Sequence, residues 1–313
     1  MRIKYFTGFI ISLFICCACQ QRKELNPAKK SDATASFSVK LPDIPVMITQ
    51  PEQRADFLAR HYWDNTLLSS SIITKHSKEL EQAWSNYIDI LKYIPFSTAK
   101  EVLNNFIEKT NEETKVFTFF TKLAEKYLYD PNSPMRNEEL YIPVLETMMA
   151  SHNIDSIQKQ RINFKLQLAL KNRPGSKAID FTYTLASGKQ ARLYNIRADY
   201  TLLFINNPGC KTCSEYTEGI MNSTIINDLI NSGKLKIFAF YTDEDIKEWY
   251  GHRQDFPSEW INGYDKKQII LKNNLYDLKA IPTLYLMDKN KVIILKDATL
   301  QVIEKWLTDH TRY

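Results

Sequence analysis

The sequence has few cysteines, and their placement excludes a protein held together by several disulfides. It contains five cysteines, and after Cys19 the only ones are Cys210 and Cys213. A secreted protein that depends on disulfides for its stability usually has several spaced pairs. A single close pair is better suited to chemistry than to scaffolding.

An excess of one charge is also lacking. The chain has 41 Lys and Arg residues against 36 Asp and Glu residues, a formal net charge of +5. Residues 1–18 contribute Arg2 and Lys4 and no acidic residue, so the chain beyond them has 39 basic and 36 acidic residues, a net charge of +3. Nucleic-acid binding requires a basic patch, and this balanced charge predicts no nucleic-acid partner.

Long apolar runs are absent as well, which excludes an ordinary transmembrane helix. The apolar stretch from Tyr5 to Ile15 follows two basic residues and is too short to span a bilayer. A basic start followed by a short apolar segment is typical of a signal sequence. Residues 1–18 are therefore predicted to be a signal peptide.

The end of this segment resembles a bacterial lipoprotein signal, because the small residue Ala18 directly precedes Cys19. The resemblance implies that Cys19 receives a lipid and anchors the chain to a membrane. Cys16 and Cys17 are alternative acceptors, and a cleaved secretory signal without lipid is the other interpretation. Residues 19–40 are rich in Lys, Ser, Ala, Glu and Gln, which predicts a flexible tether.

Residues 41–172 are predicted to form an all-helical domain of unknown function. Apolar residues recur every three or four positions between about residues 52 and 170, at Leu80, Trp84, Tyr87, Ile88, Leu91, Val102, Leu103, Phe106, Ile107, Phe119, Phe120, Leu123 and Tyr127. Capping-box spacing predicts three helix starts, at Thr98 with Glu101, Thr110 with Glu113, and Asp155 with Gln158.

Prolines and aromatic residues complete the description of this domain. Pro95, the segment from Asp130 to Pro134, and Pro143 are predicted to break or begin helices. Aromatic residues at helical spacing usually belong to a core. We therefore assign no functional role to His61, Trp63 or Trp84.

A second domain is predicted over residues 177–313, after the turn-forming cluster Asn-Arg-Pro-Gly-Ser at 172–176. Short apolar or alternating runs predict strands at Phe181–Leu185, Ala191–Tyr194, Thr201–Ile205, Lys234–Tyr241, Thr283–Met287 and Val292–Leu295. Residues Leu300–Thr308 are predicted to form a closing helix. The expected fold is a two-domain α+β protein, with an all-α domain followed by an α/β domain.

Cys210 and Cys213 lie directly after the buried strand Thr201–Ile205, at the start of a predicted helix. This spacing places both sulfurs on one helical turn, where they can form a disulfide. The N–H groups and the positive end of the helix dipole stabilise a thiolate on the first cysteine, and Lys211 adds a nearby cation. Cys210 is the candidate nucleophile, and Cys213 is the candidate resolving thiol.

Two other interpretations of the cysteine pair remain open. Half of a zinc site has the same spacing, but the chain has no second pair, and the only histidines in this domain, His252 and His310, lack ligand-like spacing. A structural disulfide is the other alternative, although so short a loop constrains the unfolded chain little. We expect no metal and no bound cofactor.

A proline about seventy residues later supports a redox site. Ile281, Pro282 and Thr283 precede an apolar strand and resemble the Ile-Pro-Thr segment of thioredoxins. The resemblance implies that Pro282 is cis, lies beside the dithiol and shapes a substrate groove. It also implies that the Ile281 backbone pairs with an extended substrate segment by strand addition. An ordinary trans proline at the start of a strand is the alternative.

The wider resemblance covers about residues 177–307, which look like the lipid- or membrane-anchored thioredoxins of the TlpA and ResA type. It includes the Asp180-Phe181 strand start, the Gly188-Lys189 hairpin and Tyr276 before the proline. The whole layout resembles an uncharacterised lipoprotein family of Bacteroidota that has a helical N-terminal domain.

The cysteine motif departs from thioredoxin at several positions. Thioredoxins have Trp before the first cysteine and Gly-Pro between the two, whereas this chain has Gly209, Lys211 and Thr212. Thioredoxins also have a buried carboxylate six residues before the first cysteine, where this chain has Phe204. The proton of the resolving thiol must therefore go to another group or to water. The peroxiredoxin motif is absent.

These observations predict an envelope thiol–disulfide oxidoreductase that reduces protein disulfides. Its expected partners are disulfide-containing envelope proteins and an upstream thiol donor, and an N-terminal lipid is expected to hold it to the membrane. The segment at residues 20–23 lacks the acidic run that resembles a surface-export signal, which favours a periplasm-facing location. The alternative is a non-catalytic envelope lipoprotein whose helical domain binds a partner or a glycan.

Overall fold

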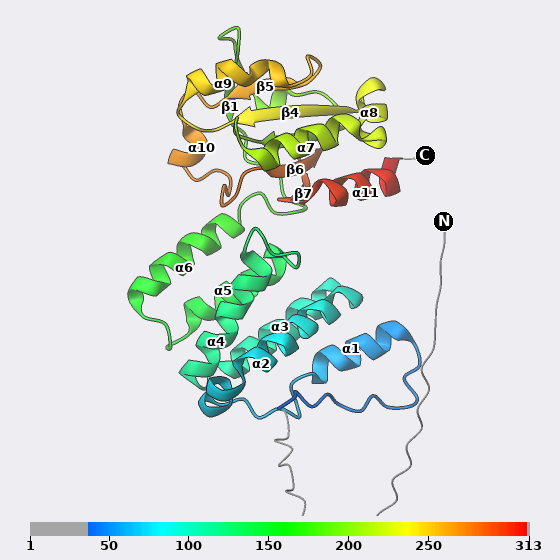
Figure 1. Ribbon diagram of the computed structural model, residues 1–313, viewed down its shortest axis with the longest axis vertical. Helices are drawn as coiled ribbons and strands as arrows, with labels where there is room; N and C mark the ends of the chain where they lie inside the picture. Colours follow the sequence, from blue (N-terminus) through cyan, green and yellow to red (C-terminus); the bar gives the residue numbers. More distant parts are fainter. Residues whose placement is uncertain (1–36, 312–313) are drawn as a thin grey trace, which may run out of the picture. The chain divides into compact units, whose positions relative to one another are not determined.

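The computed structural model describes residues 37–311 (Figure 1). The predicted signal peptide, the predicted lipidation site Cys19 and all but residues 37–40 of the predicted tether lie outside these residues. Ser38 to Tyr313 form one compact unit that holds both the helices and the sheet. Among the described residues, no helix is both long and apolar enough to cross a membrane.

The N-terminal half of the described chain is helical. Its helices are α1 Pro51–His61, α2 Ser70–Ile90, α3 Phe96–Thr110, α4 Thr114–Ala124, α5 Glu138–Ala150 and α6 Ser156–Ala169. A short 3-10 helix at Leu91–Tyr93 follows α2, and a π-helical turn at Glu125–Tyr129 follows α4. Trp63 and Trp84 are buried, and Trp63 stacks on Phe106 with ring centroids 4.8 Å apart. Their interpretation as core residues is confirmed.

His61 differs from these tryptophans because it lies at the surface of the helical half. Its Nδ1 lies 2.8 Å from a carboxylate oxygen of Asp64, and the side chains of both residues are at least 44% exposed. The residue therefore forms a local hydrogen bond, and we still assign it no role.

Only one of the three predicted helix starts is correct. The Asp155 carboxylate accepts the N–H of Gln158 at 2.8 Å and caps α6. The other two predictions are wrong, because α3 has already begun before Thr98 and Thr110 is the last residue of α3. The Thr110 hydroxyl donates to the carbonyl of Ile107 at 2.6 Å, so it provides a hydrogen bond to a backbone carbonyl in the last turn of α3. Local spacing alone did not distinguish a helix start from a helix end.

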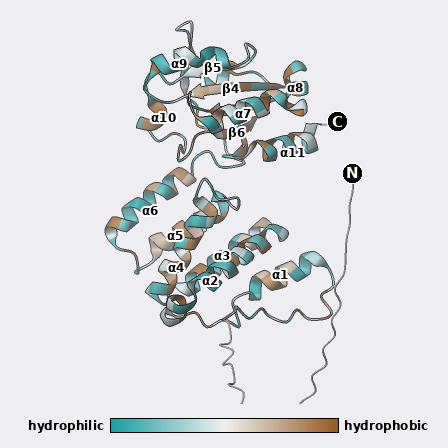
Figure 2. Cartoon of the chain, in the orientation of Figure 1, coloured by the Kyte–Doolittle hydropathy of each residue, from teal (hydrophilic) through white to brown (hydrophobic). Residues whose placement is uncertain are grey.

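Pro143 lies inside α5, so the prediction that it breaks or begins a helix is wrong. A proline removes one backbone hydrogen bond from a helix interior. The neighbouring residues 140–145 are all buried, and their packing against the other helices outweighs this loss. In Figure 2, the helices of the N-terminal half carry both hydrophilic and hydrophobic residues, whereas β4 is hydrophobic along most of its length.

A seven-stranded sheet follows the helices, in the order β2-β1-β5-β4-β3-β6-β7. The strands are β1 Thr182–Leu185, β2 Gln190–Arg192, β3 Tyr200–Ile205, β4 Leu235–Tyr241, β5 Ile261–Tyr264, β6 Thr283–Asp288 and β7 Ile293–Lys296. The pairs β3/β4 and β4/β5 are parallel, and β1/β2, β1/β5, β3/β6 and β6/β7 are antiparallel. The expected two-part α+β fold, with helices first and a mixed sheet second, is confirmed.

Helices cover the sheet, and β3 is buried on both of its faces. The helices of this half are α7 Lys211–Asn222, α8 Thr224–Asn231, α9 Ile246–His252, α10 Ile269–Lys272 and α11 Leu300–Thr311. Leu202 and Phe204 face one core together with residues of α7, α8 and α11. Leu203 and Ile205 face a second core that includes residues of α10. This central strand ends directly before the two cysteines, and it therefore fixes their position.

Candidate functional site

The two cysteines form a disulfide at the start of α7. The Cα atoms of Cys210 and Cys213 are 5.2 Å apart. Cys210 is the N-cap residue of α7, and its Sγ accepts the N–H of Cys213 at 3.2 Å. Cys213 is only 4% exposed, whereas Cys210 is partly exposed. A helix N-terminus stabilises a thiolate on the more accessible sulfur, which favours Cys210 as the nucleophile. The assigned roles stay predictions.

The backbone before the dithiol explains one departure from thioredoxin. Gly209 has a φ of +70°, in the left-handed region that L residues with side chains rarely adopt. A tryptophan at this position is strained, because a bulky residue strongly disfavours a positive φ. The glycine thus follows from the path that the chain takes from β3 into α7.

Lys211 lies at the surface. Within the described part of the chain, its side chain makes no contact with the sulfur of Cys210 or Cys213. Its side chain is 91% exposed, and its Nζ lies 3.6 Å from a carboxylate oxygen of Glu215. Solvent and this carboxylate both screen its charge. The Cys210 sulfur has polar contacts with two backbone groups, the N–H of Cys213 and the carbonyl of Ile281. The tuning role of Lys211 stays a prediction.

The predicted substrate-groove residues lie beside the dithiol. The peptide bond between Ile281 and Pro282 is cis, as the resemblance to thioredoxins implies. The Ile281 carbonyl oxygen lies 3.8 Å from Sγ of Cys210. The fold therefore brings together the two cysteines and the proline loop, which are about seventy residues apart in the sequence. Whether Ile281 and Pro282 bind substrate stays a prediction.

Phe204 occupies the position where thioredoxins have a buried acid. It is fully buried, and its ring centroid lies 6.4 Å from that of Phe256. The core cluster that contains Phe204 and Cys213 consists of apolar residues and cysteine within the described part of the chain. On its core side the resolving cysteine therefore packs against apolar side chains, and Phe204 offers no carboxylate that could accept its proton.

A small cavity beside Cys213 contains the polar groups that the sequence interpretation missed. Its volume is about 260 Å³, and its lining includes Cys213, Glu218, His252 and Asp255. The His252 Nδ1 lies 2.8 Å from Oδ2 of Asp255, and this hydrogen bond raises the pKa of His252 above its ordinary value. The His-x-x-Asp spacing is visible in the sequence, but its proximity to Cys213 depends on the tertiary fold.

A metal ion has no evident site in residues 37–311. No group of three or more His, Cys, Asp or Glu side chains in this range is arranged to hold one. The second histidine of this half, His310, contacts the Trp306 carbonyl at 2.8 Å and stacks on the Trp306 ring.

Comparison with solved structures gives a close relative over nearly the whole chain. A thioredoxin-like protein from Bacteroides caccae is 54% identical, with a TM-score of 0.86, over 88% of this chain and 99% of that one. A family described as "Domain of unknown function (DUF5106)" matches residues 16–172. The chain belongs to the DUF5106 family and is thioredoxin-like. No curated protein matches it.

Shorter relatives of this thioredoxin-like chain also come from Bacteroides. The C-terminal domain of an uncharacterized protein from Bacteroides fragilis is 57% identical over 44% of this chain and 98% of that one, with a TM-score of 0.43. A conserved protein of unknown function from the same species is 34% identical over 43% of this chain and 98% of that one, with a TM-score of 0.42. A thioredoxin-like fold with a cysteine pair supports a general redox role.

Proposed function

We propose that this chain is an envelope thiol–disulfide oxidoreductase that reduces disulfides of other proteins through Cys210 and Cys213. The observation that carries the proposal is the position of Cys210. Its sulfur is partly exposed, accepts a backbone N–H at the start of α7, and lies 3.8 Å from the carbonyl oxygen of Ile281. A reactive sulfur and a backbone carbonyl that can pair with an extended substrate segment are thus adjacent.

The reaction begins when the Cys210 thiolate attacks one sulfur of the substrate disulfide. The substrate S–S bond breaks, the first substrate sulfur leaves as a thiolate that takes up a proton, and a mixed disulfide forms. Cys213 then loses its proton and attacks the Cys210 sulfur. The mixed disulfide breaks, the second substrate thiolate leaves, and Cys210 and Cys213 become an intramolecular disulfide. Two electrons and two protons from an upstream dithiol donor restore the reduced form.

Substrate trapping tests the roles of the two cysteines. Cys213→Ser removes the resolving thiol, so the mixed disulfide with Cys210 accumulates and appears as a higher-mass band on non-reducing gels. Cys210→Ser removes the nucleophile and is the matched control, which should trap nothing. Equal trapping by both variants, or by neither, refutes the assigned roles.

The direction of electron flow is tested by the reduction potential of the pair. Because we propose a reductant, we expect a reduction potential near that of thioredoxin, roughly −270 mV. An oxidant of the DsbA kind has a potential of about −120 mV. Equilibration with glutathione or dithiothreitol of known composition gives this potential. A value close to that of the oxidant would refute the reductase direction.

The envelope location depends on Cys19, and we propose that this residue carries a lipid which holds the chain to a membrane facing the periplasm. Metabolic labelling with a fatty-acid analogue, followed by membrane fractionation, compares the natural chain with Cys19→Ala. We expect label and membrane association only in the natural chain. Label that persists in Cys19→Ala indicates that Cys16 or Cys17 is the acceptor.

The rival proposal is a lipoprotein without catalytic activity. Reduction of insulin with dithiothreitol as the donor distinguishes the two proposals. A rate equal to that of the double variant Cys210→Ser/Cys213→Ser supports the rival.

A further inference from the structure

Six charged side chains from both halves of the chain meet close to the loop that carries Ile281 and Pro282. Three are acidic and three are basic, and the side chains are 5–19% exposed. The helical half contributes Arg136 and Glu138, and the sheet half contributes Asp277, Lys279, Lys296 and Asp297. We call these six residues the ion cluster. Its charges balance, as buried charges require.

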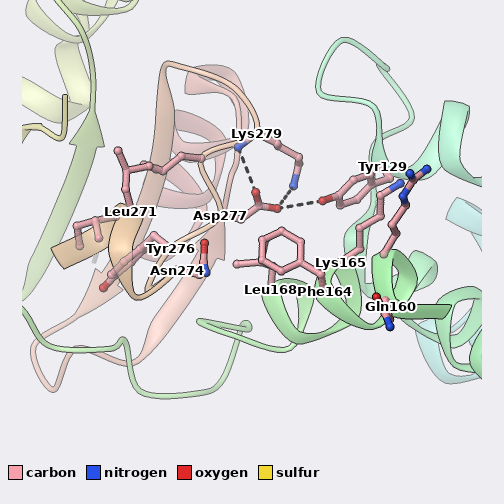
Figure 3. A pocket seen from close by; sticks show the side chains of 13 residues that line it. Tyr129, Gln160, Phe164, Lys165, Leu168, Leu271, Asn274, Tyr276, Asp277 and Lys279 are labelled. Atoms are coloured by element: carbon pink, nitrogen blue, oxygen red, sulfur yellow. Dashed lines mark hydrogen bonds and ion pairs between the residues drawn. The ribbon is translucent and has the colours of Figure 1, made fainter. Parts of the chain in front are cut away.

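Lys279 lies at the centre of the ion cluster. Its Nζ is 2.9 Å from Oδ2 of Asp277, 3.1 Å from Oε1 of Glu138 and 3.5 Å from Oδ2 of Asp297. The same ammonium lies over the ring of Tyr129, 4.6 Å from the centroid, and the Tyr129 hydroxyl lies 3.5 Å from Asp277. Figure 3 shows Asp277 between Lys279 and Tyr129. These three residues are part of the lining of a cavity of about 670 Å³.

Glu138 connects the helical half to two separate segments of the sheet half. It is the first residue of α5, where the helix N-terminus favours a carboxylate. Its Oε1 contacts Lys279, and its Oε2 lies 2.5 Å from Nζ of Lys296 at the end of β7. Lys296 is 5% exposed and also donates to the carbonyl groups of Ala169 and Lys171 at 3.0 and 2.7 Å.

The loop that contains Lys279 is held differently in its two parts. In the first part, Lys171 and Asn172 donate to carbonyl groups of residues 273–275, and the Tyr276 hydroxyl donates to the Ile179 carbonyl. The second part, residues 278–282, depends on the contacts of Lys279 and on the packing of Ile281 against the two cores. Residues 273–282 lie between α10 and β6 and form neither helix nor strand. Within the loop, the Lys279 N–H donates to Oδ1 of Asp277 at 3.1 Å, and the Thr283 hydroxyl donates to the Ala280 carbonyl at 2.6 Å. Ile281, which contacts the Cys210 sulfur, is two residues after Lys279. A displacement of Lys279 is therefore transmitted to the dithiol over a short length of backbone.

Adhesion between the halves alone does not require buried charges. Replacing a buried ion pair with apolar residues of similar volume is often neutral or stabilising, because desolvation offsets the attraction. Charges do, however, fix one geometry, since each carboxylate accepts hydrogen bonds only along set directions. A cluster of six charges beside a loop without regular structure is suited to holding that loop in one position.

We propose that Glu138 of the helical half is a positioning residue that holds the Ile281–Pro282 loop against the dithiol through Lys279. The helical half is then a structural part of the substrate groove. This inference rests on the proposed function for its catalytic consequence, whereas its structural consequence, an ordered loop, does not depend on that function.

The test compares Glu138→Gln with Glu139→Gln in the full chain. Glu139 is the next residue of α5, and it accepts two hydrogen bonds from Arg173 at 2.8 and 2.5 Å, outside the ion cluster. Both substitutions remove one carboxylate charge from the same helix start. Only the first removes the ion pairs to Lys279 and Lys296, so the comparison separates positioning from a general loss of charge.

Two measurements are made on each variant. Amide hydrogen exchange of residues 280–284 reports the order of the loop, and steady-state reduction of a disulfide-bonded peptide gives KM and kcat. For Glu138→Gln we expect faster exchange in these residues, a KM raised about tenfold and an unchanged rate of reaction with a small disulfide reagent. For Glu139→Gln we expect none of these changes.

The outcomes separate this inference from the proposed function. Equal exchange in the two variants overturns the positioning role, whatever the activity. Suppose that amide exchange of residues 280–284 is faster in Glu138→Gln but not in Glu139→Gln, and that the natural chain has no reductase activity. This result supports positioning and refutes the proposed function. Glu138→Asp is a second variant for the case that Glu138→Gln does not fold. It keeps the negative charge but shortens the side chain. Loop exchange in this variant between that of the natural chain and that of Glu138→Gln supports the proposal, and exchange equal to that of the natural chain contradicts it.

Discussion

Replacing Lys279 with methionine should destabilise the chain far more than the same change at Lys305. Both lysines form ion pairs of similar length, with nitrogen–oxygen distances of 2.9 Å from Lys279 to Asp277 and 2.7 Å from Lys305 to Asp309. They differ in burial, because the side chain of Lys279 is 13% exposed and that of Lys305 is 77% exposed. Methionine has nearly the same length, so both changes remove charge and leave packing almost intact.

The expected magnitude follows from the partners that remain. Removal of one member of a buried ion pair costs about 3–5 kcal/mol, because the other charge stays buried without compensation. Lys279→Met leaves three carboxylates facing Arg136 and Lys296, an excess of one negative charge. Since these two cations still compensate part of the charge, we expect the lower end of this range, about 3 kcal/mol. Lys305→Met should cause no measurable change, because its pair is exposed to solvent.

Urea unfolding followed by far-ultraviolet circular dichroism measures both variants. The dependence of unfolding free energy on urea is roughly 3 kcal/mol per molar for a large domain, so 3 kcal/mol moves the midpoint by about 1 M. Midpoints of the two variants within about 0.2 M of each other would refute the reasoning, since 0.2 M is well below the shift expected from this slope. A midpoint for Lys279→Met above that of the natural chain would show that desolvation of the cluster exceeds its attraction.

Three further outcomes follow from other observations. Burial alone lowers the pKa of Lys279, but the cluster carboxylates outweigh it and raise the pKa above 10.5. Stability from this group is complete below pH 10.5 and is lost as pH rises through the raised pKa, so urea midpoints should fall in strong alkali, and less so for Lys279→Met. His252 should titrate by NMR with a pKa above 6.5, and this pKa should fall in Asp255→Asn. An unchanged pKa in that variant contradicts the hydrogen bond between His252 and Asp255. Gly263→Ala places a Cβ 2.8 Å from a tyrosine ring carbon of β1 and should cost about 1–3 kcal/mol by urea unfolding, whereas Gly251→Ala, with open space around it, should not destabilise the chain.

The strands that could be predicted from the sequence are those whose apolar runs lie at the centre of the sheet. β3, β4 and β6 are buried on both faces, and their largely apolar sequences predicted them within a residue or two. β5 was missed because its sequence, Ile-Asn-Gly-Tyr, is short and half polar. It becomes a strand by pairing with β1 and β4, which is a tertiary effect that no local pattern records.

The same distinction applies to the candidate site. The cysteine pair and the later proline are local motifs, and their resemblance to the corresponding motifs of thioredoxins predicted that they meet. The contact of Glu138 with Lys279 joins residues 141 positions apart, and neither residue belongs to a motif. The position of His252 near Cys213 likewise depends on where the segment after β4 returns to the sheet. Side chains that meet only through tertiary packing leave no periodic signal in one sequence.

The ion cluster has a consequence for any fragment of this protein. A fragment that begins after residue 172 lacks Arg136 and Glu138, so Lys296 loses its carboxylate partner and Asp297 loses its guanidinium. Lys279 keeps Asp277 and Asp297, and the charge of the remaining four residues still balances. The proline loop of such a fragment therefore rests on fewer contacts than in the whole chain. Kinetics measured on it would describe a thioredoxin fold without the framework that surrounds its groove in the whole chain.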